Sequence, residues 1–545
     1  MGRGIEYEAG RSAEPLRPAS VLPSRVAPPV NDIGLNDSSL TVEDSSGMRR
    51  RQVRGSALLL VGRMLALLLT TATQVVIVRA MSKTDFGAFA YALALSGAGL
   101  TLLSLGQGRL LSRFMAKYEE QRDYDRLFGS MLLALLTILA TSTVALGALF
   151  LLPGALIGSA VHDPATVKVV LILVFLGPLD ALDQVFISLF AVFSRPNAIF
   201  FRKYLFTPLL RLGIVMTLAA THASVTFLAV GYVLAGVAGL SVSMLVFVRV
   251  LRERDLLRHL RPRHVVMPVR AVLSFSLPLI TGELFFLSLN VGGVLILGYY
   301  HSAAAVASYR AVWSPARLNN AIQQVFVPLF LPLAARLFLR KDIDGLRTAY
   351  WHTATVVTVL TFPVFALTGP LAPVVTVVLF GRRYAGSGLV LSLLATGYYF
   401  SVGLGFNAYL LQVCERIRFL VGVNVFVAAL NIALSLVLVQ RYSAVGVAVA
   451  NLCALVLQNV INQWALRRTV GSAFIDRRSL RCYLSILVCA VALWAVQVLV
   501  HPGLVLGFVA AAVAWIVVLM ASRSAMELGE TFPELRRVPL LRALV

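Results

Sequence analysis

Residues 271–338 read AVLSFSLPLITGELFFLSLNVGGVLILGYYHSAAAVASYRAVWSPARLNNAIQQVFVPLFLPLAARLF. This segment contains two apolar runs, each long enough to cross a bilayer, which are joined by a short polar turn and interrupted by prolines. Three charged side chains, Glu283, Arg310 and Arg317, lie within these runs. Because a charge at membrane depth is costly, we expect each of them to face a partner or a water-filled cavity. The segment therefore predicts a functional site inside a membrane.

The composition of the whole chain indicates the same class of protein. Of the 545 residues, 59% are hydrophobic and only 13% are charged, which is too apolar for a soluble core. The formal net charge of +23 does not predict nucleic acid binding, because the basic residues lie between apolar runs. We interpret the cysteines as small buried hydrophobic residues, because they lack metal-ligand spacing: Cys414, Cys453, Cys482 and Cys489.

Apolar runs of about 20 residues predict about fourteen transmembrane helices and therefore an all-α polytopic membrane protein. The first six are expected at residues 55–79, 86–110, 127–152, 165–192, 204–222 and 225–248. The next eight are expected at residues 271–299, 303–335, 349–369, 386–412, 417–439, 443–466, 482–500 and 503–522. Residues 370–385 are either a loop or a partial helix. Two pseudo-symmetric lobes of six helices around a central cavity are predicted, with two further helices at the C-terminus.

Loop charge tests this number of helices, because cytoplasmic loops hold most of the Lys and Arg in membrane proteins. With the N-terminus inside, the inner loops are basic; the loop between the fourth and fifth helices, for example, holds Arg195, Arg202 and Lys203. The outer loops hold few basic residues, namely Arg79, Lys83, Arg382, Arg383 and Arg441. Only an even number of helices keeps this asymmetry, so we expect both termini in the cytoplasm.

The domain boundaries follow from these helices. Residues 1–50 predict a disordered cytoplasmic tail, because they are rich in Pro, Ser, Arg and Glu and contain no long apolar run. The other predicted parts are an N-lobe at 51–248, a basic cytoplasmic linker at 249–270, a C-lobe at 271–466, helices 13 and 14 at 467–522 and a cytoplasmic C-terminal tail at 523–545. Within the N-lobe, the small residues of GVAGLSVS at 236–243 indicate a close helix contact.

Three segments together resemble one known family. Residues 78–118, VRAMSKTDFGAFAYALALSGAGLTLLSLGQGRLLSRFMAKY, resemble the start of the polysaccharide transporters, the Wzx-type flippases of lipid-linked oligosaccharides. These belong to the multidrug/oligosaccharidyl-lipid/polysaccharide exporter superfamily. Residues 273–312, LSFSLPLITGELFFLSLNVGGVLILGYYHSAAAVASYRAV, resemble the start of the second lobe in this family, and VVLFGRRYAGSG at 377–388 resembles the outer connection before the tenth helix.

The resemblance implies a transporter rather than an enzyme, in the bacterial cytoplasmic membrane, with a cavity that opens alternately to each side. The implied substrate is an undecaprenyl-pyrophosphate-linked oligosaccharide repeat unit, which is moved across the membrane for surface or exopolysaccharide biosynthesis. The implied partners are this lipid-linked oligosaccharide and membrane lipids. Interaction with a polysaccharide polymerase and a chain-length regulator is left open. The chain departs from the family at Asn290, where relatives often have an acidic residue.

Arginines are the candidates for pyrophosphate binding, because a planar guanidinium binds phosphate oxygens in pairs. We select Arg63 on the first helix, and Arg310 and Arg317 on the eighth. The last two are seven residues apart and lie on nearly one helix face. The resemblance supports this choice, since related flippases place arginines on these two helices. The alternative for each is snorkelling to the headgroups.

Polar and aromatic side chains that follow Arg310 are candidates for glycan contacts, because sugars offer hydroxyl groups and apolar faces. Trp313, Asn320 and Gln324 are the main candidates on the eighth helix. Interhelical hydrogen bonding is the alternative for most of them. The wider set consists of Asn319, Gln323, Tyr398, Tyr399, Asn407 and Tyr409.

Three acidic residues also lie deep in predicted helices. Asp180 and Asp183 share a helix face just after Pro178, and either form structural ion pairs with Arg63 or Arg211 or bind the Na⁺ or H⁺ that drives transport. We favour structural pairs, because buried arginines need counter-charges. Glu283 is the better candidate for ion coupling. Apart from such Na⁺ or H⁺ coupling, we predict no cofactor, no metal site and no catalytic residue.

Three other functions fit the same composition. They are a flippase of lipid-linked peptidoglycan precursors, a drug or cation antiporter of the same superfamily, and a membrane-embedded polysaccharide polymerase or ligase. Polymerases and ligases generally carry a long extracytoplasmic loop with clustered ionisable residues, whereas here His162 and Asp163 stand alone. Lone arginines at mid-membrane favour an anionic substrate over the cationic substrate of an antiporter.

Overall fold

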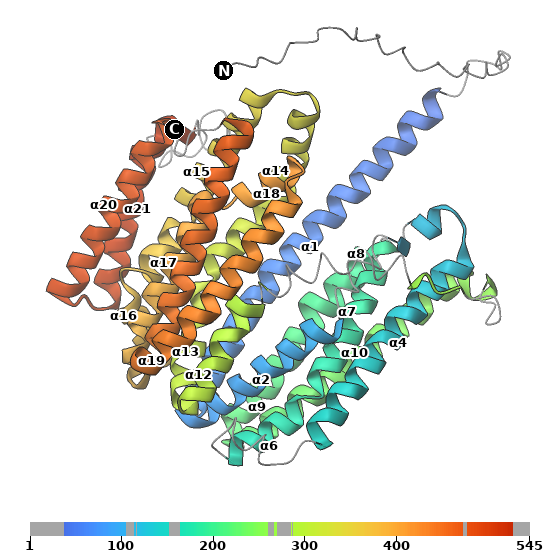
Figure 1. The fold of residues 1–545 in the computed structure, drawn as a ribbon, viewed down its shortest axis with the longest axis horizontal. Helices are drawn as coiled ribbons and strands as arrows, with labels where there is room; N and C mark the ends of the chain where they lie inside the picture. The colour runs from blue at the N-terminus through green and yellow to red at the C-terminus, as the bar shows by residue number, and fades with distance from the viewer. Residues whose placement is uncertain are drawn as a thin grey trace, which may run out of the picture. The chain divides into compact units, whose positions relative to one another are not determined.

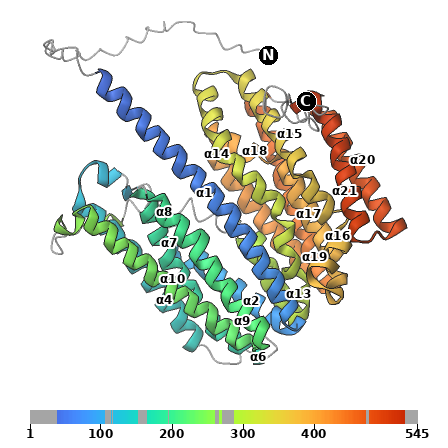
Figure 2. The same cartoon turned by 180° about the vertical axis from the view of Figure 1, so that it is seen from behind.

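The computed structural model describes residues 38–104, 114–151, 164–259, 266–269, 285, 287–471 and 477–526, apart from 116 and 194. Every regular element in these residues is a helix, as Figures 1 and 2 show. The chain divides into two units, Met1–Arg54 and Gly55–Val545. In the described part, 12 helices are long and apolar enough to cross a membrane. The predicted all-α polytopic membrane fold is therefore confirmed.

The helices before residue 260 form the first half of the larger unit. They include the π-helix η1 and the 3₁₀ helix η2. The helices α6 and α7 together make up one membrane crossing, and α8, η1 and α9 together make up the next. The bounds are α1 (Ser38–Ala80), α2 (Lys83–Ser104), α4 (Tyr124–Leu151), α6 (Pro164–Leu173), α7 (Leu176–Val192), α8 (Pro196–Ile199), η1 (Phe200–Phe206), α9 (Thr207–Thr221), α10 (Val225–Glu253) and η2 (Leu256–His259).

The second half contains several broken helices. They begin with the π-helix η4, which lies within the predicted seventh helix, and include the 3₁₀ helix η5. The bounds are η4 (Ser288–Gly292), α12 (Gly293–Tyr300), α13 (Ala303–Ala316), α14 (Leu318–Leu339), α15 (Ile343–Thr368), α16 (Ala372–Phe380), η5 (Arg382–Ser387), α17 (Gly388–Leu404), α18 (Asn407–Val413), α19 (Ile417–Val470), α20 (Arg477–Val500) and α21 (Leu504–Met526).

Two helix starts and two helix breaks depart from the prediction in ways that bear on the site. The first helix begins at Ser38, inside the segment predicted as a tail, and the fifth crossing begins at Pro196 rather than at residue 204. Proline is favoured in the first turn of a helix, where its missing N–H leaves no hydrogen bond unmade. The predicted helix 386–412 is broken between α17 and α18, and the predicted helix 303–335 is broken at Arg317. In α19, the non-helical Ser443 (φ 49°, ψ −128°) separates two helices where two were predicted.

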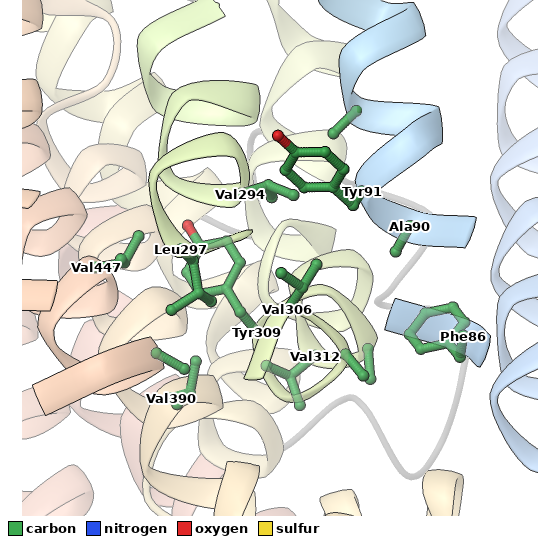
Figure 3. Packing of buried hydrophobic residues seen from close by; sticks show 14 of the residues in the cluster. Phe86, Ala90, Tyr91, Val294, Leu297, Val306, Tyr309, Val312, Val390 and Val447 are labelled. Carbon is green, nitrogen blue, oxygen red and sulfur yellow. The ribbon is translucent and has the colours of Figure 1, made fainter. Parts of the chain in front are cut away.

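The two halves meet along a seam between α2 and the α12–α13 segment. Figure 3 shows buried side chains of this seam, among them Phe86 and Ala90 from α2 and Val306 from α13. At Gly87 the backbones come so close that a Cβ atom would overlap the carbonyl group of Ala303. Only a glycine permits this approach without displacing α13.

The last two helices pack on α15. The Trp515 Nε1–H of α21 donates to the carbonyl of Val359 (3.1 Å), and a hydrogen bond of 2.9 Å joins the hydroxyls of Ser479 on α20 and Thr355 on α15. The helices therefore attach to the second half through specific polar contacts as well as apolar ones. Three of the four cysteines are buried as predicted, whereas Cys453 is exposed on α19.

Candidate functional site

The break between α13 and α14 positions the central candidate residues. Pro315 lies in the last turn of α13, where it removes one backbone donor, and Arg317 is the residue between the two helices. Arg310 lies three residues before Trp313 and Arg317 four residues after it, so both arginines lie one turn from the same indole ring. The break therefore leaves these three side chains in register.

Both arginines stack on the Trp313 ring. The guanidinium carbon of Arg310 lies 4.1 Å from the ring centroid and that of Arg317 lies 4.2 Å from it. The two guanidinium groups are thus within about 8 Å of each other, because they share one ring. Cation–π contacts of this kind orient a guanidinium without neutralising it. All three side chains are only partly buried.

Neither arginine takes part in any of the ion pairs found in the described part of the chain. Two like charges held this close repel each other, and partial burial increases the cost. An anion placed against both would remove that cost and would accept hydrogen bonds in pairs. We define Arg310, Trp313 and Arg317 as the arginine–tryptophan site.

The amides that follow divide into two groups. Asn320 and Gln324 are partly exposed; Gln324 Nε2 donates to the hydroxyl of Tyr409 (2.9 Å), and Asn320 Nδ2 donates to Oε1 of Gln323 (3.3 Å). Asn319 and Gln323 are almost completely buried. Of the main glycan candidates, Trp313, Asn320 and Gln324 therefore all keep some accessible surface.

Other members of the wider glycan set form contacts between helices. The hydroxyl of Tyr399 donates to the carbonyl of Thr358 (3.0 Å), and Asn407 Nδ2 donates to the carbonyl of Asn459 (3.1 Å). Both donors are buried. For Tyr399 and Asn407 the structure thus shows the interhelical alternative rather than an exposed contact surface.

In the first half, Asp183 of α7 forms a buried ion pair with Arg202 of η1. The distance from Oδ1 to Nη2 is 2.9 Å, and the side chains are 15% and 4% exposed. Nε of Arg202 also donates to the carbonyl of Gly239 (2.6 Å), and Ser243 Oγ donates to Asp183 Oδ1 (2.6 Å). These contacts join three neighbouring membrane crossings.

From the sequence, Arg63 or Arg211 is the predicted partner of these acids, and Arg202 is predicted to lie in a loop. For Asp183 this is wrong, because the fifth crossing begins at Pro196 and carries Arg202 into the bundle. Asp180 lies 3.7 Å from Arg211, and both side chains are partly exposed. Pro196, which follows directly after a basic residue, was the sequence signal for the earlier helix start.

The other two predicted charges lie elsewhere. Arg63 is exposed on α1 and belongs to none of the ion pairs in the described residues. It lies near Lys203, and Gly62 beside it packs against Phe200 and Tyr204. Glu283 lies outside the described residues. Within the described part of the chain, no group of three or more His, Cys, Asp or Glu side chains is arranged to hold a metal ion.

Comparisons with known proteins agree with this architecture. A family model described as "Polysaccharide biosynthesis protein" matches residues 52–338. A solved structure titled "Lipid II flippase MurJ, inward closed conformation" is similar with a TM-score of 0.64 and 13% sequence identity, over 89% of this chain and 99% of that one. No curated protein sequence matches the chain.

A second solved structure, a "multidrug resistance MATE family transporter of the MOP superfamily" in an inward-facing conformation, has a TM-score of 0.58 and 13% identity. The similarity covers 76% of this chain and 98% of that one. At such low identity, both similarities establish the fold alone. The chain therefore shares the fold of both of these solved transporter structures.

Proposed function

The chain belongs to the polysaccharide biosynthesis protein family, and we propose that it is an alternating-access flippase for an undecaprenyl-pyrophosphate-linked oligosaccharide. The family and the fold support a flippase or exporter of the multidrug/oligosaccharidyl-lipid/polysaccharide exporter superfamily, which is a transporter rather than an enzyme. The proposed location is the bacterial cytoplasmic membrane, with both termini in the cytoplasm.

The observation that carries the proposal is the arginine–tryptophan site. Two guanidinium groups within about 8 Å of each other match a diphosphate, because each phosphoryl group can take one arginine. A single phosphate or a carboxylate would need only one of them. In the described residues no carboxylate is paired with either arginine, so an incoming anion has no internal competitor to displace there.

The neighbouring side chains suit the remainder of the substrate. Asn320 and Gln324 can exchange hydrogen bonds with sugar hydroxyls from the α14 side. Arg63 on α1 is a further cation for the diphosphate, at a separate place in the fold. We propose Na⁺ or H⁺ as the coupling ion, with Glu283 as its acid, and a polysaccharide polymerase and a chain-length regulator as protein partners.

The test uses a strain from which the gene has been deleted. Wild-type protein should restore polysaccharide export, whereas Arg317→Ala and Arg310→Ala should each leave lipid-linked oligosaccharide in the inner leaflet, with normal amounts of protein in the membrane. Arg441→Ala is the matched control, because it removes an arginine that is exposed and distant from the site in sequence. Full export by the Arg310→Ala/Arg317→Ala double variant would disprove the role of the site.

A lipid-linked peptidoglycan precursor is the second candidate substrate, because one of the similar folds is titled as a lipid II flippase. The arginine–tryptophan site would suit either lipid, since both present a diphosphate. The identity of the lipid that accumulates in the deletion strain separates them. Accumulation of the peptidoglycan precursor, with normal polysaccharide intermediates, would replace the first proposal with the second.

A further inference from the structure

Two of the few basic residues in the predicted outer loops bind each other's helix ends. Arg79, in the last turn of α1, donates from Nε to the carbonyl of Leu379 (2.8 Å) and from Nη2 to the carbonyl of Val378, both in the last turn of α16. Arg383, just after α16, donates from Nη2 to the carbonyls of Val78 and Arg79, the latter at 2.8 Å. Arg79 of α1 therefore caps the C-terminal end of α16, and Arg383 caps the C-terminal end of α1.

These carbonyls are natural acceptors. The last four carbonyl groups of an α-helix have no partner within the helix, and the helix dipole makes this end negative. A guanidinium can satisfy two such carbonyls at once and can also compensate the dipole. The arrangement thus joins α1 of the first half to α16 of the second half by four hydrogen bonds with charged donors.

The turn after α16 is built to present Arg383. Gly381 ends the helix with φ 87° and ψ 169°, a conformation that side-chain-bearing residues rarely adopt. The Tyr384 ring lies beneath the turn and is completely buried. The guanidinium of Arg383 lies 5.6 Å from its centroid, and Nζ of Lys83, at the start of α2, lies 5.5 Å from it. We call Arg79 and Arg383 the outer clasp.

The clasp lies at the start of the seam between the two halves. The chain leaves Arg79, enters α2 at Lys83 and reaches Gly87, where α2 meets Ala303 at the start of α13. From there the seam continues with Phe86, Ala90 and Val306, which Figure 3 shows packed among other buried side chains. To separate α1 and α2 from α13 and α16 at this end, all four hydrogen bonds of the clasp must break.

We propose that Arg79 and Arg383 are gating residues that hold the outer side of the transporter closed. This inference rests on the proposed alternating-access function, because only a transporter that opens outward needs such a gate. The clasp suits this role because its partners are carbonyl groups and its guanidiniums are near the surface. On opening, water can solvate both arginines, so the gate is reversible, whereas a buried ion pair would be costly to break.

The test measures how often the outer end opens. In a variant whose four native cysteines are replaced, Ala90→Cys places one thiol in the seam, where Ala90 is 2% exposed. A membrane-impermeant maleimide is then added outside intact cells without added substrate. With the clasp intact, labelling should be slow. In Arg79→Gln/Arg383→Gln it should be at least about tenfold faster, since loss of one charge-assisted hydrogen bond already changes an equilibrium by about that factor.

Two further variants separate the clasp from a general loss of charge. Arg382→Gln removes the neighbouring exposed arginine and should leave the labelling rate unchanged. Arg79→Lys/Arg383→Lys keeps both charges but loses the forked donors, so it should label at an intermediate rate; this variant also answers the question if the Gln variant fails to fold. Unchanged labelling in both double variants, or equal acceleration by Arg382→Gln, would overturn the proposal. Because no transport is measured, this result is independent of the substrate test at Arg317.

Discussion

Replacement of Asp183 by Asn should strongly destabilise the first half of the protein. Asparagine has nearly the same shape as aspartate and keeps an acceptor oxygen for Ser243 Oγ, so the substitution mainly removes the charge. The guanidinium of Arg202, whose side chain is 4% exposed, would then lose its ion pair and would keep hydrogen bonds to neutral groups only. Loss of one partner from a buried ion pair costs about 3–5 kcal/mol.

A matched control lies one turn earlier on the same helix. Asp180 lies 3.7 Å from Arg211, and these side chains are 36% and 28% exposed. An ion pair with this exposure and distance contributes at most about 1 kcal/mol. The same chemical change, Asp180→Asn, should therefore have a several-fold smaller effect than Asp183→Asn.

The assay is thermal unfolding of the purified protein in detergent, read as loss of the monodisperse species. If unfolding is irreversible, unfolding rates at one temperature replace the midpoint. The double variant Asp183→Leu/Arg202→Met should recover most of the lost stability, because an apolar pair carries no desolvation penalty. An Asp180→Asn variant that is as unstable as Asp183→Asn, or a double variant less stable than Asp183→Asn, would refute the reasoning.

Two further substitutions test the packing. Gly87→Leu should abolish export, because the new side chain would meet the backbone of Ala303 and prevent the close approach of α2 to α13. Gly97→Leu, on the same helix but with open space around it, should be tolerated. Equal export by both variants would show that this close approach is not required. Tyr350→Phe should lower the thermal stability by about 1–3 kcal/mol, because the buried hydroxyl donates to Gln463 Oε1 (2.7 Å) and lies 3.3 Å from the carbonyl of Leu404 at the end of α17. An unchanged unfolding midpoint would contradict this.

The positions of the membrane crossings were largely predictable, because they depend on local properties of the chain. Apolar runs give the length of each helix, and the polar interruption near Ser443 marked the division of α19. The register of Arg310 and Arg317 on either side of Trp313 also follows from the helical period alone. These features need no knowledge of which helices are neighbours.

The partners of the charged residues were not predictable in the same way. Arg202 lies in a segment with three basic or polar residues in succession, which loop-charge counting assigns to the cytoplasm. Its side chain is stable inside the bundle only because Asp183 neutralises it and because Gly239, which has no side chain, leaves room for the guanidinium. The small residues at 236–243 did indicate a close contact, but the group that approaches Gly239 is the Arg202 side chain rather than another helix backbone.

The clasp residues show the same limit of a local rule. From the sequence, Arg79 and Arg383 are only exceptions to the predicted charge asymmetry. Their hydrogen-bond acceptors could not be identified, because they lie about 300 residues away in the chain. A positive charge on the outer side opposes the preferred topology. In the predicted topology, this opposing tendency is offset at Arg79 and Arg383 by the negative helix ends that they cap, which can be recognised only once α1 and α16 are seen together.

The pairing of charges also bears on the sign of the substrate. A transporter of cationic drugs needs a carboxylate that is free to receive the substrate, yet Asp183 is committed to Arg202 and Asp180 lies beside Arg211. Arg310 and Arg317, in contrast, are held by an indole ring that orients their charge, and neither forms an ion pair with another described residue. Asp180 and Asp183 are thus each placed beside an arginine, while the charge of the arginine–tryptophan site is positive. This imbalance favours an anionic headgroup over a cation as the transported species.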